Sequence, residues 1–129
     1  MISILIVEDD TNIQRLLSYT LRKANYAIQI ASNGQEGLHA LAEAPYDLAI
    51  IDLAMPVMNG LTMLRQLRAN PATNRLPVIM LTASADDHLR LDLEAETISA
   101  FLTKPASSRT LLKTISNVLG EQDSNEETT

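Results

Sequence analysis

The 129-residue chain contains no cysteine, and this absence removes two kinds of site at once. No disulfide bridge can form within the chain, and metal sites that use thiolate ligands are excluded. A reducing compartment is compatible with this composition, and we expect the protein to be cytoplasmic.

Long apolar segments are also missing. The first apolar run, ISILIV at residues 2–7, is too short for the core of a signal peptide and has no basic segment before it. No stretch approaches the roughly 20 residues that a membrane-spanning helix needs. We therefore expect a soluble protein with no membrane contact.

Basic charge is scarce. The chain has 10 Lys and Arg against 16 Asp and Glu, a formal net charge of -6. Residues 121–129, EQDSNEETT, hold four acids and no base, which leaves a charge of -2 on the body. The sequence shows no cluster of basic residues that would indicate direct nucleic-acid binding. Because the tail has no apolar residue to bury, we expect a disordered acidic tail or the start of a linker.

The rest of the composition suits one globular domain. Hydrophobic residues make up 46% of the chain, enough at this length for one core. Strand-like runs alternate with helical segments five times, which indicates an α/β fold with a parallel sheet covered on both faces. The predicted strands are 2–7, 27–31, 47–51, 77–81 and 100–103. The predicted helices are 11–24, 34–44, 59–70, 86–96 and 107–119.

Polar residues follow four of these strands: Glu8 and Asp9, then Asp52, Thr82 and Lys104. The carboxyl ends of parallel strands meet at one edge of the sheet, so these side chains should converge there. Clustered carboxylates repel one another unless a cation shares their charge, and oxygen ligands on a rigid edge suit Mg²⁺. A hydroxyl and an ammonium can hold a phosphoryl group while one carboxylate acts as the nucleophile. The pattern predicts Mg²⁺-dependent phosphoryl transfer onto an aspartate.

Four motifs carry a resemblance to a known family. VEDD at 7–10, IIDLAMPVMNG at 50–60, VIMLTA at 78–83 and FLTKP at 101–105 resemble the receiver domain of two-component response regulators. They occur in the right order, each after the right strand. The resemblance implies a receiver domain over residues 1–120, with a doubly wound (βα)5 fold of the flavodoxin-like strand order 2-1-3-4-5.

The same resemblance assigns roles at the sheet edge. It makes Asp52 the phosphoacceptor and gives Asp9 direct contact with the metal, with Glu8 acting through water. The main-chain carbonyl of Ala54, two residues after the acceptor, would be a further metal ligand.

Three more positions follow from the resemblance. Thr82 would be the switch hydroxyl, Lys104 the phosphate-binding lysine and Phe101 the aromatic switch residue. A cis peptide is expected between Lys104 and Pro105, since such bonds cost little before proline.

As a receiver, the chain would be a signalling switch and not a turnover enzyme. A sensor histidine kinase or a phosphotransfer protein would supply the phosphoryl group. The output would pass to a downstream protein, or to self-association, through residues 86–119. Within that region Thr97 and Ile98 stand where the family usually has Gly-Ala, and this difference bears on the choice of partner.

Three alternatives remain open. A Mg²⁺-dependent phosphatase with an aspartyl nucleophile would need an acid two residues after Asp52, where the chain has Ala54. A flavodoxin-like cofactor binder would need a Ser/Thr/Gly-rich loop after the first strand, where the chain has the acidic EDDTN. The third alternative is that the chain is the amino-terminal receiver of a longer regulator whose effector domain is missing.

Other polar residues have simpler interpretations. Asp10 is expected to cap a helix rather than to bind metal, and Asp47 to be a solvated loop residue. His39 and His88 lie in helical segments with no second ligand at a metal spacing, so both should be surface residues. The five methionines should fill the core.

Overall fold

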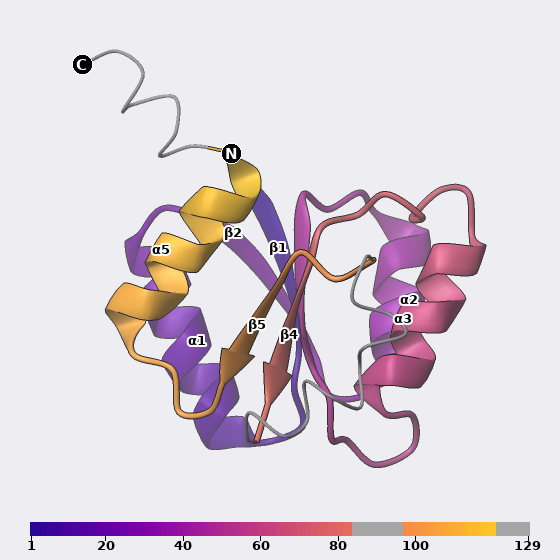
Figure 1. Ribbon diagram of the computed structural model, residues 1–129, viewed down its shortest axis with the longest axis horizontal. Helices are drawn as coiled ribbons and strands as arrows, with labels where there is room; N and C mark the ends of the chain where they lie inside the picture. The colour runs from indigo at the N-terminus through magenta and orange to yellow at the C-terminus, as the bar shows by residue number, and fades with distance from the viewer. Residues whose placement is uncertain (84–96, 121–129) are drawn as a thin grey trace.

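The computed structural model describes residues 1–83 and 97–120. Within these residues five strands form one parallel sheet in the order β2-β1-β3-β4-β5, which confirms the predicted fold class and strand order (Figure 1). The strands are β1 Ser3–Val7, β2 Ala27–Ala31, β3 Leu48–Asp52, β4 Val78–Thr82 and β5 Ala100–Thr103. The helices in the described part of the chain are α1 Thr11–Lys23, α2 Gly34–Glu43, α3 Gly60–Ala69 and α5 Ser108–Leu119.

The element boundaries agree with the sequence to within one or two residues. Asn59 and Ser107 were assigned to helices, but each is the residue that caps one, accepting a hydrogen bond from the N–H three residues on. The predicted helix 86–96, His88 and the tail 121–129 lie outside the described residues.

Helices cover both faces of the sheet. Helices α1 and α5 lie on one face, and α2 and α3 lie on the other (Figure 1). Alternate residues of a strand point to opposite faces, so Ile4 and Ile6 pack beneath α1 and α5 while Leu5 and Val7 pack beneath α2 and α3. All four side chains are fully buried. Burial on both faces explains why the central strands are continuous apolar runs.

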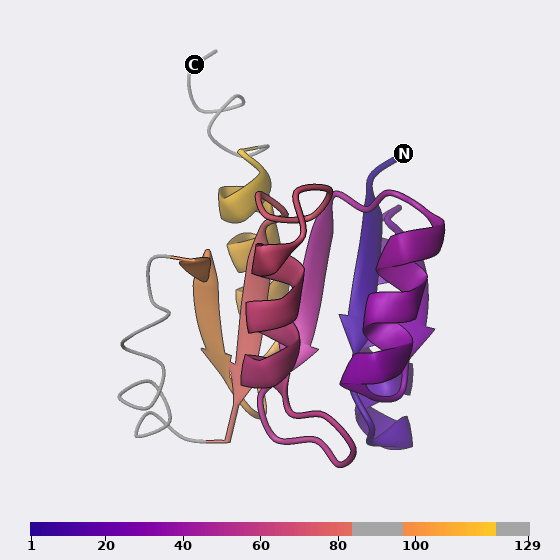
Figure 2. The ribbon, with the colours of Figure 1, turned by 90° about the vertical axis from the view of Figure 1, so that its right-hand side faces the viewer.

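The strands all point the same way, so their carboxyl ends form one edge (Figure 2). The register pairs Val7 with Ile51, Asp52 with Leu81, and Thr82 with Thr103. The residues at and just after these ends therefore lie side by side, as the sequence predicted.

Local signals behave as expected at most helix ends. Asp10 caps α1, since its Oδ1 accepts hydrogen bonds from the N–H groups of Asn12 and Ile13. Asn25 follows α1 with a φ of 71°, in the left-handed region that asparagine tolerates. No helix in the described residues is long and apolar enough to cross a membrane.

Asp47 is an exposed residue of the loop before β3, as expected, and it also makes two hydrogen bonds to Ser3. Its Oδ2 accepts a hydrogen bond from the Ser3 N–H, and its own N–H donates to the Ser3 carbonyl, both at 2.8 Å. The side chain thus closes the amino-terminal end of the β1–β3 pair. Sequence reasoning could not foresee this contact because it joins residues from two separate strands.

Candidate functional site

Glu8 is the first residue after β1, and its side chain is completely buried. Its N–H donates to the Ala31 carbonyl at 3.0 Å, which holds the main chain at the end of β2. Its Oε2 accepts a hydrogen bond from the Asp10 N–H at 3.0 Å. The cap of α1 and the position of this carboxylate are therefore set by the same short turn.

Asp52 ends β3 and is 3% exposed. Its Oδ1 accepts a hydrogen bond from the Ala54 N–H at 3.3 Å. Gly60, at the start of α3, packs against the Asp52 main chain so closely that a Cβ there would clash with the Asp52 carbonyl oxygen. The Gly60 N–H also donates to the Leu53 carbonyl at 2.8 Å. The start of α3 thus fixes the end of β3 at Asp52 from one side.

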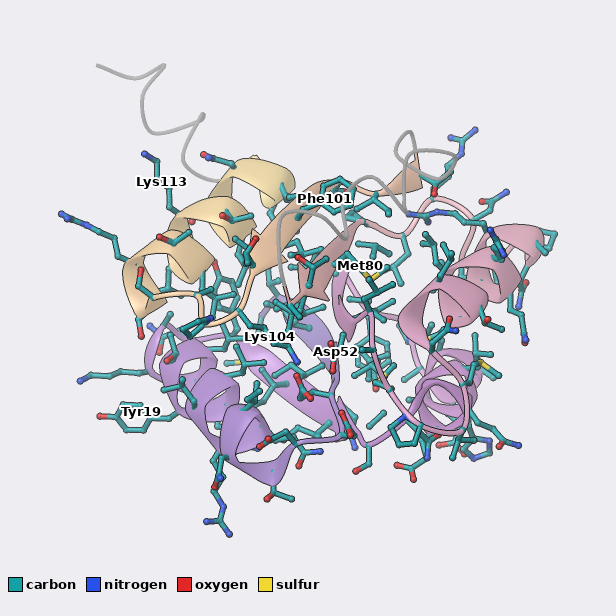
Figure 3. All side chains as sticks on the ribbon, turned by 60° about the horizontal axis from the view of Figure 1, so that its bottom comes forward. Tyr19, Asp52, Met80, Phe101, Lys104 and Lys113 are labelled. Carbon is teal, nitrogen blue, oxygen red and sulfur yellow. The ribbon has the colours of Figure 1, made fainter. Side chains whose placement is uncertain are left out.

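Lys104 joins the two buried carboxylates. Its Nζ lies 3.0 Å from Glu8 Oε1 and 3.0 Å from Asp52 Oδ2. In Figure 3 the Lys104 side chain extends from the end of β5 toward Asp52. The Lys104 N–H donates to the Thr82 carbonyl at 2.7 Å, so β4 and β5 place the ammonium together. The Lys104–Pro105 peptide is cis.

Burial and charge act in opposite directions on these groups. Desolvation by burial raises the pKa of Glu8 above its usual value, although the Asp10 N–H and Lys104 oppose the rise. Burial also disfavours the charged form of Lys104, but its contacts with Glu8 and Asp52 outweigh burial, and the pKa of Lys104 is raised. The Lys104 ammonium therefore stays charged at neutral pH, whereas burial disfavours the ionised form of Glu8.

Asp9 completes a group of three acids. Carboxylate oxygens from Glu8, Asp9 and Asp52 all lie within 4.8 Å of one another, and Asp9 is exposed while the other two are buried. One ammonium cannot balance three carboxylates, so the site retains negative charge. The buried Glu8 Oε1 has no hydrogen bond of good geometry within the described residues besides its ion pair. An all-oxygen donor set with residual negative charge fits a small divalent cation.

The other predicted positions surround this group. Thr82 is fully buried, and its hydroxyl donates to the Leu102 carbonyl at 3.5 Å. Phe101 is half-buried and lies beside Met80, its partner in the β4–β5 register (Figure 3). Ala54 is exposed next to the acceptor.

Two supporting residues were missed by sequence reasoning. The side-chain amide of Gln14 donates to the Glu8 carbonyl and braces the acidic turn from α1. Gly60 permits the close approach of α3 to Asp52. The glycine directly after the Asn59 cap was a usable signal, whereas nothing in the sequence marked Gln14.

The remaining simple interpretations are mostly confirmed. His39 is a surface residue paired with Glu43 at 2.8 Å, both being largely exposed. Among the methionines, Met63 and Met80 are fully buried and Met55 nearly so. Met1 is 93% exposed and does not fill the core.

Comparison with known proteins agrees with this geometry. The family model of the response regulator receiver domain matches residues 4–116. The transcriptional regulatory protein ResD of Bacillus subtilis is 40% identical over 117 residues, which cover 90% of this chain and 47% of ResD. The chain therefore spans about half the length of that relative.

Solved structures extend the likeness to the fold. Chemotaxis protein CheY4 of Vibrio cholerae superimposes with a TM-score of 0.86 at 33% identity, covering 92% of this chain and 99% of that one. Response regulator TrrA of Thermotoga maritima, in complex with Mg²⁺-BeF, gives 0.82 at 32% identity, covering 92% and 100%. With the sheet order, the acidic edge and the matched motifs, these likenesses lead to one conclusion: the chain belongs to the response regulator receiver domain family.

Proposed function

We propose that this receiver domain is a signalling switch that accepts a phosphoryl group on Asp52. One observation carries the proposal: Lys104 Nζ lies 3.0 Å from both Glu8 and Asp52 at a buried sheet edge that also holds Asp9. A structural ion pair would need only one carboxylate. The surplus of acids around a single ammonium instead supports a site that handles a cation and a phosphate.

The proposed step is an in-line displacement. A carboxylate oxygen of Asp52 attacks the phosphorus of a donor, and the bond from phosphorus to the donor atom breaks. With a phosphohistidine donor, the imidazole nitrogen leaves with the electron pair. Lys104 swings from Asp52 Oδ2 to the incoming phosphoryl oxygens, where its charge balances theirs. The product is an acyl phosphate on Asp52.

The proposed metal ligands are Asp9, Asp52 and the Ala54 carbonyl, with Glu8 acting through water. A bound Mg²⁺ supplies positive charge for the transferring phosphoryl oxygens. The partners of Glu8 support its indirect role, since one oxygen accepts from the Asp10 N–H and the other faces Lys104. Asp9 is exposed, so its carboxylate is accessible to a cation.

Thr82 and Phe101 are the proposed switch. The Thr82 hydroxyl faces the β5 main chain at Leu102 over 3.5 Å, a long contact that a phosphoryl oxygen would replace. Phe101 is half-buried on β5, and it would turn inward as Thr82 moves. The output would leave through residues 86–119, of which 97–119 are described.

The wider role follows from the family. We propose residues 1–120 as the receiver, residues 121–129 as a disordered acidic tail or the start of a linker, and a sensor histidine kinase or a phosphotransfer protein as donor. We place this protein in the cytoplasm, and its coverage of only 47% of ResD fits the amino-terminal receiver of a longer regulator. The phosphatase alternative lacks support, because the exposed methyl group of Ala54 offers no acid or base two residues after Asp52.

The acceptor is tested with a small acyl phosphate and Mg²⁺. Intact-mass spectrometry should find one added phosphoryl group that hydroxylamine removes. Asp52→Asn should abolish the adduct, because an amide cannot attack phosphorus. Asp47→Asn is the matched control at the other end of the same strand, and it should be labelled like the wild type. An adduct that persists in Asp52→Asn refutes the assignment.

A further inference from the structure

Among the described helices, α1 and α5 carry only positive charge and lie on one face of the sheet, while α3, on the other face, is also purely basic. Helix α1 holds Arg15, Arg22 and Lys23, helix α5 holds Arg109 and Lys113, and neither contains Asp or Glu. These are half of the 10 cations in the chain. All five side chains are exposed, and none pairs with a carboxylate among the described residues.

The fold places these helices next to each other. Both cover the same face of the sheet (Figure 1), and Leu17 and Leu21 of α1 share a core cluster with Leu111 of α5. Thr20 and Ser108 hydroxyls lie 3.3 Å apart across the two helices. This grouping was not predicted from the sequence, because the cations are far apart in sequence and meet only in the folded chain.

The α1 side of this basic face is also hollowed. A surface cavity of about 720 Å³ runs along α1 to Ile30 of β2 and includes Arg15, Tyr19 and Arg22 in its lining. Tyr19 is 66% exposed, and Lys23 Nζ lies 5.5 Å from the centre of its ring. In Figure 3 Tyr19 and Lys113 both point away from the body of the molecule. Exposed cations around a shallow groove suit an extended acidic segment.

Such a segment follows α5 directly. Residues 121–129 carry four acids and no base, against five cations and no acid on the two helices. Helices α1 and α5 each follow a parallel strand, so both run back from the site edge and end at the opposite edge of the sheet. Gly120 ends α5 with a φ of 77° and turns the chain there, at the edge where Arg22 and Lys23 lie.

The tail is long enough to cover the face. Nine extended residues reach about 30 Å, whereas the 13 residues of α1 span about 20 Å. The tether also keeps the acids at an effective concentration near millimolar, so weak contacts are occupied. We propose that residues 121–129 bind in the same molecule to the basic face formed by α1 and α5, and thereby keep this face from other acidic ligands.

Paramagnetic relaxation tests the proposal on the full chain. Because the chain has no cysteine, Ser124→Cys gives one site for a nitroxide label. At about 0.01 M ionic strength, where charges act over about 30 Å, amide peaks of residues 15–19 should lose roughly half their intensity or more. The loss should vanish near 1 M, where the range is about 3 Å. Amides of α2 and α3, on the other face, serve as the internal reference.

Variants of the charged residues test whether the tail of the same molecule is what binds the basic face. Arg22→Gln with Lys23→Gln should restore the α1 peaks, and the matched pair Arg65→Gln with Arg75→Gln, two exposed cations elsewhere, should not. Neutralising the four tail acids should also restore the peaks. An unaffected α1 at low salt overturns the proposal, as does a loss that survives neutralisation. Peak loss in a mixture of labelled and isotope-enriched chains would mean that a second copy supplies the tail, which also overturns it.

Discussion

At the residue scale, Glu8 is the most constrained group of the site. It is fully buried, and its carboxylate faces one ammonium and one main-chain N–H. Burial raises its pKa, which means that the fold holds the ionised form less well than the unfolded chain does. A residue that weakens the fold at neutral pH and lies at a sheet edge is expected where function requires charge.

The pH dependence of stability tests this view of Glu8. A raised pKa contributes stability below the ordinary value of 4.5, and that contribution is lost as pH rises through the folded-state pKa. In metal-free buffer the free energy of unfolding of the wild type, relative to Glu8→Gln, should therefore fall as the pH rises above 4.5. Lys104 does not affect this measurement, because the stability linked to its raised pKa changes only above pH 10.5. Urea denaturation followed by circular dichroism measures the difference, and a pH-independent difference contradicts the prediction.

Metal affinity distinguishes direct from indirect ligands. Asp9→Asn should weaken Mg²⁺ binding by more than about tenfold, because it removes a direct charged ligand. Glu8→Gln should weaken Mg²⁺ binding less, since the proposed role of Glu8 is to contact the metal through water. Isothermal titration provides the comparison, with Asp10→Asn as the control that keeps the helix cap. Equal losses from Asp9→Asn and Glu8→Gln would refute the division of roles.

Much of the site could be predicted at this scale. Glu8, Asp9, Asp52, Thr82 and Lys104 were expected at one sheet edge because each follows an apolar run, and the structure places them there. The pairing of Lys104 with both buried acids was not predicted, since side-chain conformations depend on neighbours from three strands.

At the element scale, the contact between α3 and β3 holds Asp52, the proposed acceptor, in place. Gly60→Ala should lower the free energy of unfolding by about 1–3 kcal/mol, because the new methyl group meets the rigid Asp52 main chain. Gly37→Ala in α2 is the matched control. Its methyl group would meet the flexible end of Met63 and, at 3.0 Å, Val7 Cγ2, but no main-chain atom, and the gain of about 1 kcal/mol in helix propensity partly offsets these contacts, so its loss should be smaller than that of Gly60→Ala. Equal effects of the two changes in urea denaturation would contradict this explanation.

The elements themselves were largely readable from the sequence. Runs such as LAII and VIML mark buried strands, and Asp10 marks the start of a helix through local chemistry. The contact of Asp47 with Ser3 and that of Gln14 with Glu8 were not predicted, because they connect separate elements, which local patterns do not encode.

At the scale of the whole molecule, β4 and β5 link the site to the surface. The Thr82 hydroxyl and carbonyl both contact the β5 segment, at Leu102 and Lys104. A phosphoryl group on Asp52 shifts the conformation only through contacts that differ between the two states. Thr82 is the proposed source of such a contact, because its hydroxyl would face β5 in one state and the phosphoryl group in the other.

The Thr82→Ala variant should therefore accept the phosphoryl group but show a smaller conformational change in response to it. Hydrogen exchange over residues 100–104 should change on phosphorylation of the wild type and change roughly half as much in the variant. Thr103→Ala, the exposed partner in the register, is the matched control and should behave as the wild type. A full response in Thr82→Ala would remove this residue from the switch.

The position of Lys104 on the last strand also has a consequence for protein synthesis. Ribosomes release the amino-terminal half first, so Glu8 and Asp52 emerge well before the lysine that balances them. Strands β1, β2 and β3 are adjacent in the sheet, but closing their acidic edge without Lys104 would bury uncompensated charge. A nascent chain therefore keeps this edge hydrated until β5 docks, and an interrupted translation product would not acquire a closed site.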